Sequence, residues 1–462
     1  MHGVHGLHGL HGHAPHVCCR GGGPLPLPLP LAPMLVAASA ATATARPRWL
    51  HRLTPAAASR RAHAGASSSP GQRPARRRGW DAPRGSVTAE AGSHDGRVAP
   101  HHGSYPRVCV ADGHGMVYAA YHALGRSGLT APGPGGKVSG ALHGFCLKLS
   151  ALLSGTAPGL GGAFDRVVVV FDGRRDGGGT LPHSRESLTA HLPPERRYKA
   201  SRPPFPNDLK EQMEASKAAC TALGVPWASS PPGYEADDLI AALCAPSPGR
   251  LAASAHVTVV SHDKDLCQVV RDSHPSVCIA HSVRGGGGGG GYVVLREADF
   301  PSAKIPVRPR SLGDFLALVG DPSDGVAGVK GIGKVKAVQA LNAADAHFRA
   351  LDGDGAEPRP FADVLAPDAH GNLVHLDALA EDLPKSLIAS LRDREQQEAF
   401  RLARDLVALR ADTCPVPPEL DAKAVLAPTG PGDRHAAHAF LAEWGLHSVR
   451  DKLLAAHYLS PE

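Results

Sequence analysis

Three short apolar segments that each lead into an aspartate constrain the fold of this chain most strongly. They are 108–111 before Asp112, 166–171 before Asp172, and 257–261 before Asp263. The four consecutive valines of the second segment are typical of a buried strand in a parallel sheet. Helical patterns lie between and after these strands, at 138–153, 206–223 and 235–244. This alternation predicts an α/β fold with a parallel sheet.

Nine acidic residues are candidates for one ligand cluster. Ligands of an open α/β sheet gather at the carboxyl ends of its strands, so Asp112, Asp172 and Asp263 are expected to converge. Other acids follow the third strand, begin the 235–244 helix and follow a helix that ends near 320. The acids that begin the 235–244 helix also suit the helix dipole, so stabilising that helix is an alternative role for them. The full set is Asp112, Asp172, Glu235, Asp237, Asp238, Asp263, Asp265, Asp321 and Asp324.

This many carboxylates cannot share a pocket as anions unless cations offset their repulsion. Oxygen-only ligands indicate Mg²⁺ or Mn²⁺ rather than zinc. A site with two such ions suits phosphodiester hydrolysis, because one ion generates a hydroxide and the pair stabilises the attacking and leaving oxygens. None of the nine cysteines forms a Cys-x-x-Cys pair, which predicts reduced core thiols and no structural zinc.

A glycine-rich segment at 328–337 has three interpretations. A Walker-type phosphate loop requires Ser or Thr where Val335 stands, and both that loop and a dinucleotide fingerprint require a preceding strand. The preferred interpretation is a hairpin between two helices that approaches DNA phosphates through backbone N–H groups. It predicts sequence-independent duplex binding. Its candidate DNA-binding residues are Lys330, Gly331, Gly333, Lys334 and Lys336.

A basic cluster between 183 and 204 surrounds one tyrosine. It comprises Arg185, Arg196, Arg197, Tyr198, Lys199 and Arg202. It is either a solvated run of charge or a phosphate clamp that guides a strand toward the carboxylates.

The formal net charge of +6 is very unevenly distributed. Residues 1–80 contain ten of the 49 basic residues and no acid, so the rest of the chain carries 39 basic against 43 acidic residues. An arginine-rich, acid-free leader predicts a disordered transit peptide that is removed, with a secretory signal as the alternative. The glycine run at 285–291 predicts a flexible hairpin insertion rather than a phosphate cradle. No apolar stretch is long enough to predict a membrane span.

The order of the motifs resembles the 5′→3′ exonuclease, or flap endonuclease-like, family. The matching segments are Ala111-Asp112-Gly113-His114, Phe171-Asp172, 198–204, 233–238, 263–266 and 320–333. The resemblance runs from about 108 to 342 and more weakly to about 455. It implies a PIN-like α/β nuclease domain with a helical arch, followed by a helix–three-turn–helix element that binds DNA.

The resemblance also implies roles for individual residues. A first metal site would draw on Asp112, Asp172, Glu235, Asp237 and Asp263, and Asp238, Asp265, Asp321 and Asp324 would complete a second. Tyr118, Arg185, Lys199 and Arg202 match positions that handle the 5′ strand and the scissile phosphate. Gly331 and Gly333 match the DNA-backbone hairpin, where the family also holds a potassium ion.

The sequence departs from the family pattern at Ala119, Gly325, Ala327 and Val335, which replace Arg, Asn, Pro and Lys. All nine acids remain, so we expect a Mg²⁺- or Mn²⁺-dependent 5′→3′ DNA exonuclease with flap endonuclease activity. The alternatives are a non-catalytic, structure-selective DNA-binding protein with the same fold and a PIN-type ribonuclease.

The expected organisation is a leader at 1–104, a nuclease domain at 105–305 and a helical DNA-binding subdomain at 306–462. The nuclease domain would contain an arch insertion at about 173–205. Helical patterns in the subdomain lie at 312–320, 334–342 and 384–409. We expect a stand-alone monomer that acts on DNA with 5′ ends, flaps or RNA primers, alongside an organellar DNA polymerase. The leader favours a chloroplast over a mitochondrion.

Overall fold

The computed structural model describes residues 105–124, 139–173, 181, 184–283, 291–301, 303, 305–353, 358–428 and 433–461. All of these residues belong to one compact unit. The expected leader at 1–104 lies outside the described residues. So do 174–180 and 182–183 of the expected arch and 285–290 of the glycine-rich loop.

A six-stranded sheet, in the order β3-β2-β1-β4-β5-β6, forms the centre of this unit. Its strands are β1 (Arg107–Asp112), β2 (Arg166–Phe171), β3 (Trp227–Ser229), β4 (His256–Val260), β5 (Val277–Val283) and β6 (Gly291–Leu295). Strands β1 to β5 are parallel, and β6 pairs antiparallel with β5. Asp112 lies beside Val170, and Ala111 beside Val260, so β1, β2 and β4 end at one edge. The predicted parallel α/β core is confirmed.

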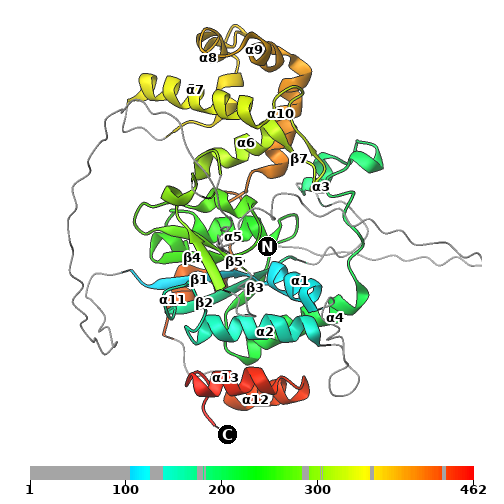
Figure 1. The fold of residues 1–462 in the computed structure, drawn as a ribbon, viewed down its shortest axis with the longest axis vertical. Helices are drawn as coiled ribbons and strands as arrows, with labels where there is room; N and C mark the ends of the chain where they lie inside the picture. The colour runs from blue at the N-terminus through cyan, green and yellow to red at the C-terminus, as the bar shows by residue number, and fades with distance from the viewer. Residues whose placement is uncertain are drawn as a thin grey trace, which may run out of the picture. The chain divides into compact units, whose positions relative to one another are not determined.

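Alternate residues of β1 face opposite sides of the sheet, as the period of a strand requires. Val108 and Val110 join a core that includes α5 (Ala236–Cys244), whereas Cys109 and Ala111 join a second core. The second core includes α1 (Gly113–Leu124), α2 (Gly140–Leu153) and α4 (Asn207–Ala222). The sheet is therefore covered on both faces, with α5 apart from α1, α2 and α4 (Figure 1).

A helical region follows the sheet, as predicted. It consists of α6 (Leu312–Val319), the two-residue strands β7 (Gly320–Asp321) and β8 (Val326–Ala327), α7 (Lys334–Asp352), α8 (Val374–Ala378), α9 (Lys385–Arg392) and α10 (Arg394–Val407). The next helix, α11 (Ala422–Leu426), lies against β2 of the sheet. Helix α6 packs against α7 and α10 and shares its hydrophobic core with α5. The single helix expected over 384–409 is instead α9 and α10. Asp393 separates the two helices. Its carboxylate caps α10 by accepting a hydrogen bond from the Gln396 N–H at 3.2 Å.

The last two helices differ from the expectation for 306–462. Helices α12 (Arg434–Glu443) and α13 (His447–Ala455) pack on α4 and α2, on the side of these helices that faces away from the sheet (Figure 1). Leu441, Val449 and Leu453 are buried in the same core as α2. The apolar side chains of these helices thus complete the sheet domain, not the helical region.

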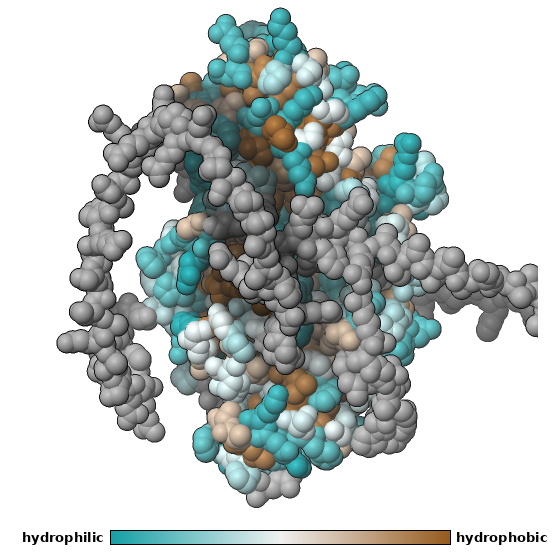
Figure 2. Space-filling view, viewed as in Figure 1, coloured by the Kyte–Doolittle hydropathy of each residue, from teal (hydrophilic) through white to brown (hydrophobic). Residues whose placement is uncertain are grey.

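Hydrophilic side chains cover most of the visible surface at the end of the molecule formed by α8 and α9 (Figure 2). None of the helices that the structure describes has the length and apolar character needed to cross a membrane.

Candidate active site

Asp112 and Asp172 end adjacent strands and fix the segments around them. The Asp112 carboxylate accepts hydrogen bonds from the Gly115 N–H at 2.7 Å and from the Ser261 hydroxyl at 2.8 Å. The Asp172 carboxylate accepts one from the N–H of Ala236, the first residue of α5, at 2.7 Å. These bonds tie the carboxyl ends of β1, β2 and β4 to the start of α5.

Asp237 and Asp263 bring two more carboxylates to this place. The Asp263 N–H donates to the Ser261 hydroxyl at 3.0 Å, next to Asp112. Burial, together with the charges of Asp263, Asp112 and Asp172, raises the pKa of Asp237 well above its ordinary value. Burial also raises the pKa of Asp112 to about 6. The structure therefore gathers four predicted acids, and we call Asp112, Asp172, Asp237 and Asp263 the strand-end cluster.

Asp265, Asp321 and Asp324 form a second group, and basic side chains accompany it. Lys264 bonds Asp321 and lies 3.7 Å from Asp265, while the Arg202 guanidinium contacts the Asp324 carboxylate at 2.6 Å. Burial raises the pKa of Asp265 to about 7, and one of its oxygens is buried without a hydrogen bond. Sequence reasoning missed Lys264, although its place between Asp263 and Asp265 was the available signal.

Glu235 lies between the two groups and holds part of the predicted phosphate clamp. The Lys199 ammonium contacts the Glu235 carboxylate at 2.5 Å, and the Tyr198 hydroxyl donates to it at 3.2 Å. Burial acts to raise the pKa of Glu235, but Lys199 and Arg185 hold it below its ordinary value. Lys199 also donates its backbone N–H to the Asp324 carbonyl at 2.8 Å, so the clamp segment is attached to Glu235 and to the second acid group.

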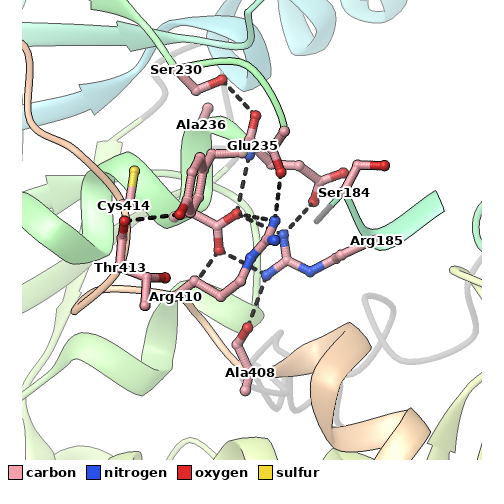
Figure 3. Close-up of polar contacts among 12 residues, drawn as sticks. Ser184, Arg185, Ser230, Glu235, Ala236, Ala408, Arg410, Thr413 and Cys414 are labelled. Atoms are coloured by element: carbon pink, nitrogen blue, oxygen red, sulfur yellow. Dashed lines mark hydrogen bonds and ion pairs between the residues drawn. The ribbon is translucent and has the colours of Figure 1, made fainter. Parts of the chain in front are cut away.

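Asp238 does not join the other acids. It is fully buried, and its carboxylate receives both terminal nitrogens of Arg185 at 2.8 Å. Arg410 donates to it through its backbone N–H and its guanidinium, each at 3.0 Å. Figure 3 shows Arg185 and Arg410 converging there from two segments of the chain. Burial alone would raise the pKa of Asp238, but Arg185 and Arg410 hold it below its ordinary value.

These contacts correct two expectations. The Asp238 carboxylate is occupied by arginines, because Asp238 is the third residue of α5 and forms a capping box with Glu235. Arg185 is only 3% exposed and also bonds the Ala408 carbonyl at 2.9 Å, so it does not face the place of an incoming strand. Arg410 is 172 positions from Asp238, and nothing in the sequence pattern signals their contact.

The donor atoms of the strand-end cluster are of the kind that a hard divalent cation prefers. Its donors are all oxygens, and among the described residues only His114, and no Lys or Arg, forms an ion pair with it. Burial and the neighbouring carboxylates raise the pKa of Asp237. Within the described ranges, no three Asp, Glu, His or Cys side chains are arranged so that they could hold a metal ion by themselves. Mg²⁺ retains several waters and uses one or two carboxylates plus substrate phosphate, so an open arrangement suits it.

The predicted DNA-binding hairpin lies at the surface between α6 and α7. Lys330, Gly331, Gly333 and Lys334 are exposed, and Gly333 caps the N-terminus of α7. Gly331 has φ of +80°, a conformation that favours glycine. The Lys336 ammonium donates to the Gly331 carbonyl at 2.9 Å, which closes the hairpin onto α7.

Tyr118 lies on the exposed side of α1, with its ring centroid 4.4 Å from that of His122. His114, which was not predicted as a site residue, approaches Asp172 at 3.5 Å from the start of the same helix. The first turn of α1 therefore places the His114 ring next to Asp172, at the edge of the sheet where the strand-end cluster lies.

Residues 107–286 match the family described as the 5′-3′ exonuclease, N-terminal resolvase-like domain. The resemblance inferred from the motifs is therefore confirmed for this part of the chain, which is a 5′-3′ exonuclease-like domain. Among its relatives, DNA polymerase I of Chloroflexus aurantiacus is 31% identical over 74% of this chain and 30% of its own length. The thermostable DNA polymerase I of Thermus thermophilus is 33% identical over 51% of this chain and 24% of its own length.

The chain thus spans less than a third of the length of these relatives. Among solved structures, the T5 D15 protein co-crystallized with metal ions is similar over 76% of this chain and 99% of its own. That similarity has a TM-score of 0.39 and 14% sequence identity.

Proposed function

We propose that this chain is a divalent-metal-dependent nuclease that degrades DNA from 5′ ends and cleaves 5′ flaps. The observation that carries the proposal is the strand-end cluster. Its four carboxylates form no ion pair with a Lys or Arg of the described residues, and they lie inside the segment that matches the exonuclease family. Such a cluster is unfavourable without cations and useful with them. Two ions, when bound, would supply the positive charge that acidifies a water and stabilises the reacting phosphate.

Each acid group has its own part in this proposal. The strand-end cluster, with Glu235, would hold the first ion, and Asp265, Asp321 and Asp324 would hold the second. Asp238 is left out, because it is fully buried and both of its carboxylate oxygens receive arginine nitrogens. Mg²⁺ or Mn²⁺ is the expected ion, since every donor is a carboxylate oxygen.

The basic residues of this chain would bind and orient the strand. Lys199 and Arg202 lie against Glu235 and Asp324, so a phosphate between the acid groups would be within reach of both. The exposed hairpin would hold the duplex through Gly331, Gly333 and its lysines, by phosphate contacts that carry no sequence preference. We also propose that the hairpin and its two flanking helices form a helix–three-turn–helix element, and that this element binds a potassium ion.

The setting we propose is replication or repair of organellar DNA, in a chloroplast rather than a mitochondrion, as a monomer beside an organellar polymerase. The arginine-rich, acid-free leader supports an organellar destination. A fluorescent protein fused to residues 1–104 should be imported into the chloroplast. Diffuse fluorescence would contradict this part of the proposal.

Cleavage of a 5′-flapped duplex by the full-length chain in Mg²⁺ tests the activity. We expect products with 5′-phosphates, and loss of cleavage in Asp172→Ala. Binding without cleavage would favour the non-catalytic alternative, for which Ala119, Gly325 and Val335 are the motivation. Faster cleavage of an RNA flap than of a DNA flap would favour a ribonuclease.

A further inference from the structure

A small hollow adjoins the strand-end cluster on the α1–α2 face of the sheet. Its lining comes from α1, α2, the ends of β4 and β5, and β6. The lining residues are Met116, Lys148, Val260, Ser261, His262, Ala280, Ser282 and Tyr292. Ser261 belongs to both places, because it lines the hollow while its hydroxyl bonds Asp112 at 2.8 Å. A group in this hollow would therefore lie next to the proposed reaction site.

Lys148 gives this hollow its charge. It projects from α2, is half-buried, and has no hydrogen-bond or ion-pair partner within the described residues. Burial lowers its pKa, and no carboxylate lines the hollow to offset the cost. A lysine that only packs its stem places its ammonium in water or on an acid. Lys148 instead lines a hollow that has no acid among its lining residues.

Neutral polar groups complete the hollow. The His262 ring and the Ser282 hydroxyl are 2.8 Å apart, at the ends of the parallel strands β4 and β5. Hydroxyl, imidazole and ammonium groups together can donate several hydrogen bonds, and a phosphate group accepts that many. No acidic side chain is among the lining residues.

We propose that Lys148, with His262 and Ser282, binds a phosphate group of the nucleic-acid substrate beside the carboxylates. The inference rests on the proposed nuclease function and deepens it, because it places a strand on the α2 side of the site as well as on the Lys199 side. The phosphate belongs to a strand backbone or to the mononucleotide that cleavage releases. Both sources present the same phosphate group to the hollow, and the experiment below distinguishes between them.

The test uses the full-length chain with Lys148→Met, which keeps the apolar stem and removes the charge. Lys148→Arg is the conservative variant. Lys423→Met is the matched control, because Lys423 is exposed on α11, a helix that lies against β2 and whose Val425 carbonyl bonds Arg166 at the start of that strand. Binding of a 5′-flapped duplex is measured in Ca²⁺ at several salt concentrations, and inhibition of cleavage by a 5′-mononucleotide is measured in Mg²⁺.

We expect Lys148→Met to weaken duplex binding about tenfold and to reduce the slope of log Kd against log salt by about one. Lys148→Arg should bind like the wild type, and the melting temperature of Lys148→Met should not fall. Unchanged duplex binding with about tenfold weaker mononucleotide inhibition would support the phosphate site and assign it to the product.

A wild type that binds and cleaves DNA while Lys148→Met matches it in both assays would overturn this inference alone. Equal losses in Lys148→Met and Lys423→Met would also overturn it. A wild type that binds neither probe would overturn the proposed function together with this inference.

Discussion

Arg185 and Asp238 form a buried bidentate ion pair, with both N–O distances at 2.8 Å. The pair joins the segment before α4 to the start of α5, and Arg410 adds the segment that follows α10. Glu235 takes part as well, because its N–H donates to Asp238 at 3.1 Å while its own carboxylate receives Arg185 at 3.2 Å. The position of Glu235 in the site therefore depends on side chains from three separate segments.

Breaking this ion pair should destabilise the fold. Asp238→Asn leaves two arginines facing a neutral amide in a buried place, and such a loss costs about 3–5 kcal/mol of unfolding free energy. Chemical denaturation would measure it. The control is Asp377→Asn, since Asp377 pairs with Arg392 on the surface and its loss should change stability little. Equal stability of both variants would contradict the structural role of Asp238.

The strand-end cluster and Asp265 should make the metal-free protein less stable as the pH rises. Folding raises the pKa of Asp112 to about 6 and of Asp265 to about 7, so the folded state holds these protons more tightly than the unfolded state. Their favourable contribution is complete below the unfolded pKa of about 4 and is lost as the pH rises to about 7.

Melting temperatures in a chelator at pH 5 and pH 8 would measure this effect. We expect a lower value at pH 8, a smaller drop in Asp112→Asn, and recovery when Mg²⁺ is added at pH 8. A melting temperature that is higher at pH 8 than at pH 5 in the chelator, in both proteins, would contradict the electrostatic account.

Lys199 should act on the reacting phosphate more than on substrate affinity. Lys199→Met should lower kcat on a flapped duplex by about 100-fold, because it removes a charged donor beside the acids, with Kd changed only a few-fold. Single-turnover cleavage measures this. Lys210→Met, an exposed lysine of α4, is the control and should behave like the wild type. A large increase in Kd with unchanged kcat would assign Lys199 to binding alone.

The hairpin lysines should contribute affinity without sequence preference. The double variant Lys330→Gln/Lys334→Gln should reduce the salt-dependence slope of duplex binding by about two. Its kcat at saturating DNA should stay near the wild-type value. Anisotropy titrations on duplexes of different sequence would show equal losses, and a loss confined to one sequence would contradict a backbone-only contact.

The sequence predicted the sheet edge well, because apolar runs that lead into Asp112, Asp172 and Asp263 mark buried strands directly. It missed β3, which has three residues. It predicted a hairpin around the glycine run but gave no bounds for its two strands, β5 and β6, which pair antiparallel. Long-range partners were not predictable, and Asp238 illustrates this best. Its three-residue spacing from Glu235 placed both on one helix face, whereas the capping geometry turns Asp238 toward Arg410, far along the chain.

The C-terminal boundary was missed for a similar reason. The pattern over 434–455 is helical, but a helical pattern does not say against which surface the apolar face packs. Helices α12 and α13 lie on α4 and α2 because Leu441 and Leu453 find apolar partners there.

The most direct test compares two neighbouring acids, Asp237 and Asp238, in Mg²⁺-dependent cleavage of a 5′-flapped duplex. Asp237→Asn removes a member of the strand-end cluster, whereas Asp238→Asn removes the partner of Arg185. We predict that Asp237→Asn loses at least about 1,000-fold in rate without a lower melting temperature. Asp238→Asn should melt earlier but still cleave at temperatures where it is folded. An inactive wild type, or an Asp237→Asn variant as fast as the wild type, would contradict the central claim.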